Sequence, residues 1–515
     1  MTQIFLDGQS LTIEQVRLVS QNPKVQVALS EACLPGIRKS AEAVAELVAR
    51  GEVAYGITTG FGAFKDRVIP PDQVETLQEN ILLSHAVGVG DFLDEETVRA
   101  MMLIRANTLA RGYSGVRLET LQLLLSLLNK NILPRIPEKG SLGASGDLAP
   151  LAHMALPLIG MGNVCWKGRE MPAAEALAQA GLSPVRLRAK EGLALTNGTT
   201  LMTALGALLC AQAESLMRSA NLAAALTLEA QNGTLWAFAE EIHRLRPQPG
   251  QQETAALFRT LLQNSQFTRP HDPKNIQDAY TLRCIPQVHG AVKHVIDQVR
   301  EIIAIELNSV TDNPLVFWSE DDRPLVISGG NFHGEPLALS LDFLSIALTD
   351  LGNMSERRIA KLVDNCSSTA AYPPFLTEHG GVNSGFMLLQ YTAAALSSEN
   401  KTLSHPASTD SIPSSGNVED HVSMGPNAAL HCREILRNIA VIIAIELFCA
   451  AQALDFRMQK QPQLRQGKIT QQAYALIRSE VPFLPQDSLL HPHLERILKM
   501  VRSGAFEACF SDLKV

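Results

Sequence analysis

The stretch GSLGASGDLAP at residues 140–150 places three glycines around a single Ala144-Ser145 pair. Ser145 is a potential nucleophile. A hydrolase serine in a strand-to-helix turn needs the pattern Gly-x-Ser-x-Gly, whereas here Gly146 follows the serine directly. A purely structural interpretation is also available, in which Ser145 or Asp147 caps a helix that carries Pro150 in its first turn. The pattern argues against a hydrolase serine and leaves the role of this stretch open.

Metal and nucleotide chemistry are poorly supported by the spacing of the polar residues. The thirteen histidines supply no HExxH pattern, and His289 and His294 are five residues apart, which is off one helical face. The segment TTGFGAF at 58–64 lacks the glycine spacing and the strand–helix frame of a dinucleotide fingerprint. We therefore expect neither a catalytic metal nor a nucleotide cofactor.

Other groups that could do chemistry are concentrated in glycine-, asparagine- and serine-rich segments between helical patterns. Loops on a rigid scaffold are where reactive groups are usually presented. Each segment taken alone is weak evidence, and an ordinary turn is the simpler interpretation of it. The segments cover residues 55–64, 84–91, 194–200, 277–287, 328–336 and 411–425.

Helical patterns dominate the segments that must position these loops. Apolar residues recur at three- and four-residue spacing over 97–112, which ends at Gly112, and over 118–132. After residue 201 the helical segments lengthen and become apolar around nearly their full circumference, which is typical of central helices in a large bundle. Strand signals are confined to 164–168 and 315–319, and no alternation of strands and helices is present.

The composition is that of a globular protein with no evident nucleic-acid or membrane partner. Of its 515 residues 46% are hydrophobic and 19% are charged, which excludes a disordered chain. The formal net charge of −8 and the lack of a lysine or arginine block argue against nucleic acid. The longest apolar run, 439–454, is interrupted by Glu446 and is short for a membrane span, so it predicts a buried bundle helix.

The cysteines and the N-terminal residues favour the cytoplasm. The eight cysteines are scattered with no CxxC pair, which in so long a chain is typical of reduced thiols. Asp7, Gly8 and Glu14 stand where a signal peptide would need an apolar core. We therefore expect a cytoplasmic protein.

Nine segments occur together along the chain: YGITTGFG, LLSHAVGVG, GSLGASGDLAPLAHMAL, AKEGLALTNGT, YTLRCIPQ, ISGGNFHGEP, GGVNSGF, SENKTLSHPAS and GNVEDHVSMG. In this combination, from about Leu11 to about Arg457, the sequence resembles the aromatic amino-acid ammonia-lyases. Two positions depart from the pattern of that family. Thr58 stands where the family carries Asn, and Val418 stands where it carries Gln.

The resemblance implies a prosthetic group made from the chain itself. Ala144, Ser145 and Gly146 would cyclise and lose two waters, giving the dehydroalanine-type electrophile methylidene-imidazolone (MIO). The nitrogen of Gly146 must approach the carbonyl of Ala144, a contact that a residue without Cβ makes most easily. Such an electrophile can take up the amine of the substrate or attack its aromatic ring, and the sequence does not choose between them.

The resemblance also implies roles for individual residues. Tyr55 would be the acid or base at the β-carbon, and its phenol pKa, ordinarily about 10, would have to be lowered for work at neutral pH. Arg283 would clamp the carboxylate of the substrate, because its planar fork suits bidentate binding. The remaining predicted site residues are Tyr280, which is catalytic, and Ser84, His85, Asn197, Gln277, Phe332 and Glu419, which bind substrate or MIO.

We expect from the resemblance a mainly α-helical enzyme, with an N-terminal MIO-bearing domain at 1–195 and a helical-bundle domain at 196–515. It would be a homotetramer whose active sites combine loops from several subunits. The expected reaction is elimination of ammonia from L-histidine to give trans-urocanate, as in histidine degradation. A carboxylate at Glu419 can accept an imidazole N–H, and we expect this residue, with Ser84 and His85, to decide the substrate.

Two alternatives stay open. Within the family, the chain could be a lyase or a 2,3-aminomutase that acts on tyrosine or phenylalanine. In a different class, it could be an inactive, crystallin-like structural bundle, which the intact Ala-Ser-Gly tripeptide, Tyr55 and Arg283 disfavour.

Overall fold

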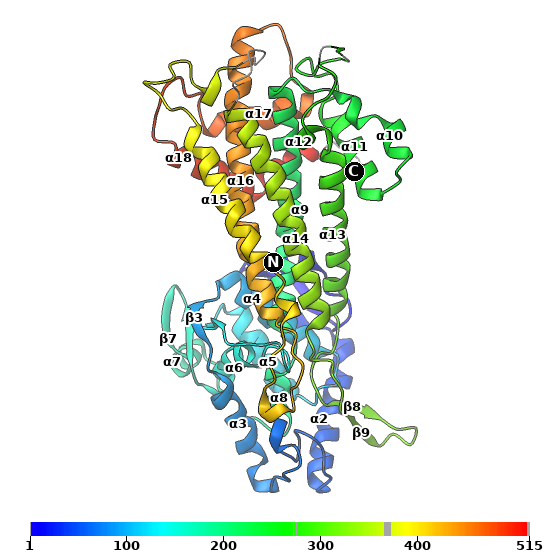
Figure 1. Cartoon of the computed structure of the whole chain (residues 1–515). Helices are drawn as coiled ribbons and strands as arrows, with labels where there is room; N and C mark the ends of the chain where they lie inside the picture. The colour runs from blue at the N-terminus through cyan, green and yellow to red at the C-terminus, as the bar shows by residue number, and fades with distance from the viewer. Residues whose placement is uncertain (1, 271, 274, 365–371, 512–515) are drawn as a thin grey trace. The chain divides into compact units, whose positions relative to one another are not determined.

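The computed structural model describes residues 2–270, 272–273, 275–364 and 372–511 (Figure 1). It confirms a mainly α-helical chain. The longest helices are α9 (Thr200–Ala230), α13 (Ile285–Glu306), α14 (Glu335–Val363) and α16 (Gly425–Lys460).

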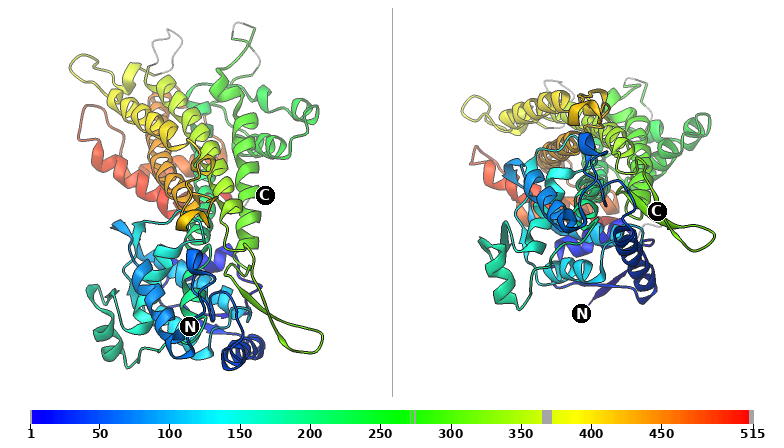
Figure 2. Two further views of the ribbon diagram at one scale, coloured as in Figure 1. Left: turned by 60° about the horizontal axis from the view of Figure 1, so that its bottom comes forward. Right: turned by 90° about the horizontal axis from the view of Figure 1, so that it is seen from below.

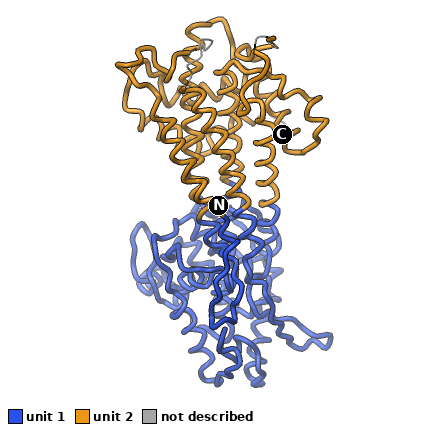
Figure 3. The backbone as a smooth tube through the Cα atoms, in the orientation of Figure 1, with its two compact units in different colours: residues 1–211, 300–342, 406–430 blue, residues 212–299, 343–405, 431–515 orange. Residues whose placement is uncertain are grey.

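The chain divides into two compact units, which are built from interleaved segments (Figure 3). Unit 1 comprises residues 1–211, 300–342 and 406–430, and unit 2 comprises 212–299, 343–405 and 431–515. The predicted segment 1–195 lies entirely in unit 1, whereas the predicted segment 196–515 is shared between the two units.

Unit 1 is interleaved because two later segments of the chain return to contact its N-terminal residues. Asn308 accepts a hydrogen bond from the backbone N–H of Leu11 at 2.9 Å. The Ser423 hydroxyl donates to the carbonyl of Gly143 at 3.2 Å. Contacts this distant along the chain are not encoded in local hydrophobic periodicity.

Unit 1 contains the shorter helices and the strands around its loops. Its helices besides the long ones are α1 (Ile13–Gln21), α2 (Leu34–Ala49), α3 (Val74–His85), α4 (Glu95–Ala110), α5 (Leu118–Asn129), α6 (Leu148–Ala155), α7 (Ala173–Ala180) and α8 (Glu191–Thr196). The expected helices at 97–112 and 118–132 therefore form, each with slightly different bounds. The turn after α4 requires Gly112, because its φ is +75° and a Cβ there would lie 2.6 Å from the backbone of Gly36.

The strands of unit 1 are short and pair locally. The two expected strands appear as β6 (Asn163–Trp166), antiparallel to β7 (Arg169–Pro172), and β8 (Leu315–Trp318), antiparallel to β9 (Pro324–Ile327). The β8–β9 hairpin extends away from the rest of unit 1 (Figure 2). The structure adds β1 (Gln3–Leu6), parallel to β2 (Gln26–Leu29), then β3 (Val89–Phe92) with β5 (Pro137–Lys139), and β4 (Leu133–Pro134) with β6.

Unit 2 is a helical bundle. In Figure 1 its parts of α9, α13, α14 and α16 run roughly parallel to α15 (Met387–Leu403). Its other helices are α10 (Glu240–Arg244), α11 (Pro249–Leu261), α12 (Tyr280–Arg283), α17 (Lys468–Glu480) and α18 (His491–Ser503).

The apolar run at 439–454 is buried inside α16, as the sequence predicts. Glu446, which interrupts the run, is fully buried and accepts hydrogen bonds from Nε and Nη2 of Arg358 at 2.6 and 2.9 Å. The hydroxyls of Thr227 and Ser355 complete its set of donors. A buried carboxylate needs such partners, which explains how an acidic residue is tolerated in an apolar helix.

Three helices in the described part of the chain, α9, α14 and α16, are long and apolar enough to cross a membrane by length and composition. Inside the protein, 83%, 72% and 89% of their most apolar windows are buried. Their apolar side chains therefore contact other parts of the same protein, as expected of helices central to a bundle.

Candidate active site

A cavity of about 1240 Å³ lies in unit 1, and most of the predicted site residues line it. Loops from distant parts of the sequence form its wall, together with the end of α3. The predicted residues on its lining are Tyr55, Ser84, His85, Ala144, Ser145, Asn197, Phe332 and Glu419. The structure thus brings together residues that the sequence places more than 300 positions apart.

The Ala-Ser-Gly loop is held in a conformation that requires its glycines. Gly146 has φ of +76°, and a Cβ on it would lie 2.1 Å from the carbonyl oxygen of Gly198. A Cβ on Gly143, whose φ is +67°, would lie 2.3 Å from the hydroxyl of Ser423. No side chain fits at such distances, so these glycines serve a tightly enclosed backbone and not merely a flexible turn.

Asp147 does not cap the helix that follows it, which corrects the structural interpretation of this stretch. Helix α6 begins at Leu148, but no side chain forms its N-terminal cap. The carboxylate of Asp147 instead accepts hydrogen bonds from the backbone N–H groups of Leu201 and Met202, in the first turn of α9, at 2.7 and 3.1 Å. The reason is tertiary: Asp147 is fully buried, and it accepts from first-turn N–H groups of α9 that have no partner within their own helix.

The carbonyl oxygen of Ser145 accepts hydrogen bonds from two N–H groups. Nδ2 of Asn197 donates to it at 2.8 Å and the backbone N–H of Gly198 at 3.4 Å. The backbone N–H of Asp147 also donates to the carbonyl of Gly198 at 2.7 Å, which joins the Ala-Ser-Gly loop to the segment that carries Asn197. Donors fixed around one oxygen can stabilise negative charge that develops on it. The other amide atom of Asn197, Oδ1, is buried without a hydrogen-bond partner in the structure.

Glu419 lies over the serine and is not an ordinary solvated loop carboxylate. The hydroxyl of Ser145 donates to its Oε1 at 3.0 Å, and the hydroxyl of Ser414 donates to its Oε2 at 3.1 Å. Neither contact involves Val418, so the departure from the family pattern at that position does not remove a support of Glu419. The carboxylate is held half-buried at the cavity wall.

His85 and Ser84 face the same cavity from the end of α3. Burial lowers the pKa of His85, and the charge of Glu419 acts in the opposite direction. The Ser84 hydroxyl donates to the carbonyl of Asn80 at 2.8 Å and lies 3.0 Å from Nδ1 of His85. This arrangement favours a proton on Nδ1, which leaves Nε2 of the neutral imidazole as an acceptor.

Tyr55 lines the cavity from a tight turn. The backbone N–H of Gly62 donates to its phenol oxygen at 3.3 Å. Thr58 fastens this turn, because its hydroxyl accepts from the N–H of Ala54 at 2.9 Å and donates to the carbonyl of Glu52 at 2.6 Å. Thr58 is buried and does not line the cavity, so its departure from the family pattern concerns the support of Tyr55.

Gln277, Tyr280 and Arg283 belong to unit 2 and are not among the residues that line the cavity. Tyr280 and Arg283 stand at the two ends of α12, where the guanidinium lies 4.3 Å from the centre of the tyrosine ring. Tyr280 is 70% exposed, while Nε of Arg283 is buried without a hydrogen-bond partner in the structure. Asp278 anchors the segment 277–283. Its carboxylate accepts hydrogen bonds from Nη2 of Arg269 at 2.5 Å and from the backbone N–H of Thr234 at 2.7 Å.

One group of possible metal ligands escaped the sequence analysis. His333, Glu335 and His421 bring ligand atoms within 4.8 Å of one another. No short motif signals them, because His421 is far from the other two along the chain. Nδ1 of His333 accepts the N–H of Glu335 at 3.3 Å, and its Nε2 faces Nδ1 of His421 at 3.4 Å. Both ring nitrogens of His333 are therefore engaged within the protein, and the absence of a catalytic metal stays a prediction.

The family model for aromatic amino acid lyases matches residues 11–479, which include both the cavity loops and the strip 277–283. The chain belongs to the aromatic amino acid lyase family. Histidine ammonia-lyase of Chloroflexus aurantiacus is 59% identical to this lyase over 509 residues, covering 98% of this chain and 97% of that protein.

Solved structures of the family have the same fold as this lyase. Histidine ammonia-lyase from Trypanosoma cruzi matches with a TM-score of 0.90 and 40% identity, covering 99% of this chain and 95% of that one. Tyrosine aminomutase from Streptomyces globisporus matches with a TM-score of 0.92 and 38% identity, covering 99% and 98%. The family therefore unites this fold with more than one reaction on an aromatic amino acid.

Proposed function

We propose that this lyase eliminates ammonia from L-histidine to give trans-urocanate. The observation that carries the proposal is the carboxylate of Glu419, which stands at the cavity wall within hydrogen-bond distance of Ser145. An imidazole N–H can donate to that carboxylate, whereas a phenyl ring has no donor to offer. The similarity to histidine ammonia-lyases over nearly the whole chain supports the same assignment.

The residues around the Ala-Ser-Gly loop fit the MIO group. The absence of space for a Cβ at Gly146 matches a backbone that must fold back on itself. When formed, MIO supplies an electrophilic methylidene carbon at the position of Ser145. The N–H groups of Asn197 and Gly198, which donate to the Ser145 carbonyl oxygen, would hold the group there and would stabilise negative charge on that oxygen.

Four residues of this chain act on the substrate. The unpaired Oδ1 of Asn197 accepts a hydrogen bond from the substrate ammonium group, because it is a buried acceptor at the cavity wall. Glu419 and His85 bind the imidazole ring and fix its tautomer. Tyr55 moves the proton at the β-carbon, with its phenol oxygen oriented by the N–H of Gly62.

The carboxylate of the substrate is bound by a second copy of the chain. Arg283, together with Gln277 and Tyr280, reaches the cavity from a neighbouring subunit of a homotetramer. The cavity volume supports this proposal, since about 1240 Å³ exceeds the roughly 300–1,000 Å³ of typical small-molecule sites. A free amino acid leaves room in such a cavity for residues of another copy. The buried, unpaired Nε of the partly exposed Arg283 and the exposed ring of Tyr280 are consistent with a contact that a single chain does not make.

The enzyme works in the cytoplasm without a nucleic-acid or membrane partner. No disulfide joins the cysteines in the described part of the chain, as expected of a reducing compartment.

A substrate panel tests the assignment. Ammonia release and the absorbance of each unsaturated acid are measured for histidine, tyrosine and phenylalanine, and histidine is expected to have the highest kcat/KM. The structural similarity to a tyrosine aminomutase gives the second candidate, a tyrosine-directed reaction. Preference for tyrosine, with a β-amino acid among the products, would support that candidate. Release of ammonia from none of the three would favour an inactive structural bundle.

A further inference from the structure

Helix α8 leads directly into the site, yet it is too short to hold itself in place. It spans six residues, Glu191–Thr196, and the next residue is Asn197. All six are buried. Isolated helices shorter than about 12 residues are marginal in water, so tertiary contacts must set the position of α8.

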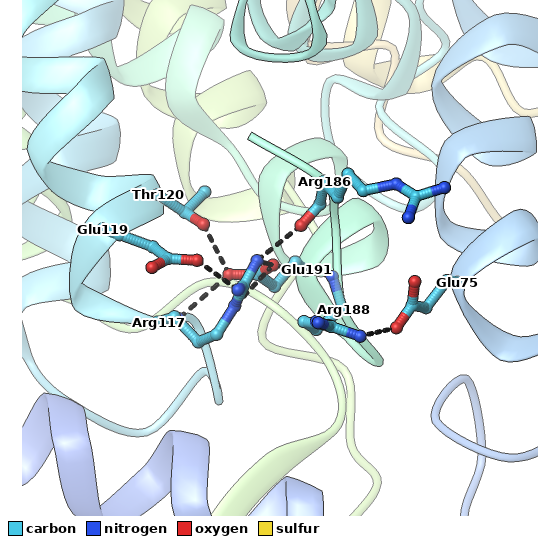
Figure 4. Close-up of polar contacts among 7 residues, drawn as sticks. All are labelled: Glu75, Arg117, Glu119, Thr120, Arg186, Arg188 and Glu191. Carbon is cyan, nitrogen blue, oxygen red and sulfur yellow. Dashed lines mark hydrogen bonds and ion pairs between the residues drawn. The ribbon is translucent and has the colours of Figure 1, made fainter. Parts of the chain in front are cut away.

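The first end of α8 is anchored by a fully buried carboxylate (Figure 4). Glu191 accepts from the hydroxyl of Thr120 at 2.6 Å, from Nη2 of Arg117 at 2.7 Å and from the backbone N–H groups of Arg117 and Arg188 at 3.0 and 2.8 Å. In the same figure Arg188 pairs with Glu75 at the surface. A negative charge also complements the positive end of a helix dipole.

The last end of α8 is anchored by a fully buried cation from α4. Nη2 of Arg105 donates to the carbonyls of Ala194 and Asn197, the latter at 2.8 Å. Its Nη1 lies against Gly198, where an added Cβ would be 2.7 Å away. Burial lowers the pKa of Arg105 to about 10, and nearby Asp312 and Asp147 counter that effect, so the guanidinium stays charged at neutral pH.

The guanidinium of Arg105 thus binds the same residue whose side chain reaches the reacting loop. The backbone N–H of Asn197 donates to the carbonyl of Leu193 at 2.9 Å, and the carbonyl of Asn197 accepts from Arg105. Hydrogen bonds therefore fix both peptide groups of this residue. Its Nδ2 then meets the carbonyl of Ser145 at 2.8 Å. A shift of the carbonyl of Asn197 would move that donor away from Ser145.

We propose that Arg105 is a positioning residue, which sets Asn197 against the carbonyl of Ser145, while Glu191 secures the opposite end of α8. The inference rests on the proposed function, because it assigns Asn197 a role in the elimination. Arg105 itself does not line the cavity and touches no substrate.

Arg99 provides a matched control on the same helix. It is also buried, at 2% exposure, and donates to the backbone carbonyls of Val19 and Leu128 and to the side chain of Asn131. None of these partners lines the cavity. Arg99→Met therefore removes an equivalent set of bonds from the same helix without disturbing Asn197.

The test compares kcat, KM, Tm and intact mass for the wild type, Arg105→Met and Arg99→Met. We expect Arg105→Met to lower kcat per cyclised chain by about tenfold to hundredfold, since a misplacement of about 1 Å can cost that much. KM for histidine should change much less. Its mass spectrum should contain a residual uncyclised fraction, because Gly198 also encloses Gly146. Arg99→Met should have a lower Tm than the wild type but should cyclise fully and keep the wild-type kcat.

A double-mutant cycle shows whether Arg105 acts through Asn197. In an Asn197→Ala background, Arg105→Met should lower kcat far less than it does in the wild type. If Arg105→Met does not fold, Arg105→Lys replaces it throughout, with a smaller loss expected because its shorter side chain cannot hold both carbonyls equally.

Two results would overturn the inference: a kcat per cyclised chain equal to that of Arg99→Met, or losses that multiply fully in the Asn197→Ala background. Failure of the proposed function is recognised separately, because the wild type would then not deaminate histidine.

Discussion

Oε1 of Glu419 accepts a hydrogen bond from the hydroxyl of Ser145 at 3.0 Å, although 274 residues separate the two along the chain. The contact places a carboxylate beside the atom on which the proposed chemistry centres. Glu419 belongs to a mainly exposed loop, but the contact with Ser145 fixes the position of its carboxylate. A carboxylate in a fixed position can recognise a substrate. Removing either partner should therefore change chemistry more than stability.

The first prediction concerns the covalent state of the chain. If Ala144, Ser145 and Gly146 cyclise, the intact protein should weigh about 36 Da less than its sequence implies, corresponding to two waters. Ser145→Ala should show no mass loss and nearly no ammonia release. Borohydride, which attacks an electrophilic alkene, should abolish the activity of the wild type. A wild-type mass equal to that of the unmodified chain would contradict the MIO proposal.

The second prediction is that turnover does not depend on a metal ion. His333 already engages both of its ring nitrogens within the protein, so the group with Glu335 and His421 lacks a free imidazole lone pair on that residue. Exhaustive chelation should therefore leave kcat unchanged in the wild type and in His421→Ala alike. Activity that is lost on chelation and restored by zinc in the wild type, but not in His421→Ala, would establish this group as a metal site.

Sequence reasoning identified the residues of the cavity better than the contacts that hold them. The resemblance to the family singled out Tyr55, Asn197 and Glu419, and the structure places all three on one cavity. Arg105 gave no such signal, because a charged residue in an amphipathic pattern is normally expected on the solvent face. Its burial depends on carbonyl groups that arrive from another helix.

Local patterns also failed where the decisive partner is distant. The structural interpretation of residues 140–150 offered Asp147 as a cap of its own helix, but the donors that it satisfies belong to α9, more than 50 residues later. Helical periodicity likewise predicted the existence of the long helices but not the return of 300–342 and 406–430 to unit 1. The parallel pairing of Gln3–Leu6 with Gln26–Leu29 joins two segments on either side of α1 and was likewise not predicted.

The third prediction concerns the pH dependence of stability. Burial raises the pKa of Asp147 to about 7, with the charge of Glu306 adding to the rise and Arg105 opposing it. The folded protein therefore holds a proton that the unfolded chain releases near pH 4, and this contribution to stability falls as pH rises from about 4 to about 7. Asp147→Asn cannot titrate, so the Tm of the wild type should fall relative to this variant across that range.

Thermal unfolding followed at matched ionic strength checks this expectation. Asp72→Asn, which changes an exposed aspartate, is the control and should follow the wild type at every pH. A constant difference in Tm between the wild type and Asp147→Asn would show that Asp147 is ionised throughout the range.

The fourth prediction is that Glu419→Gln lowers kcat/KM for histidine much more than for tyrosine or phenylalanine. A hydrogen bond between the imidazole N–H and a carboxylate contributes about 1.5–3 kcal/mol, which corresponds to roughly tenfold to a hundredfold. A phenyl ring has no donor for that carboxylate and leaves its Oε1 without a partner, and a site built to hydrogen-bond its substrate can reject an analogue that lacks the donor by about 10⁴-fold. Asp420→Asn is the matched control, since Asp420 is the next carboxylate on the same cavity wall and its replacement should leave the substrate preference unchanged.

Steady-state kinetics with all three substrates measure the substrate preference of each variant. If Glu419→Gln leaves histidine kinetics unaltered, then Glu419 does not recognise the imidazole and the histidine assignment loses its structural basis, even though the chain remains an aromatic amino acid lyase.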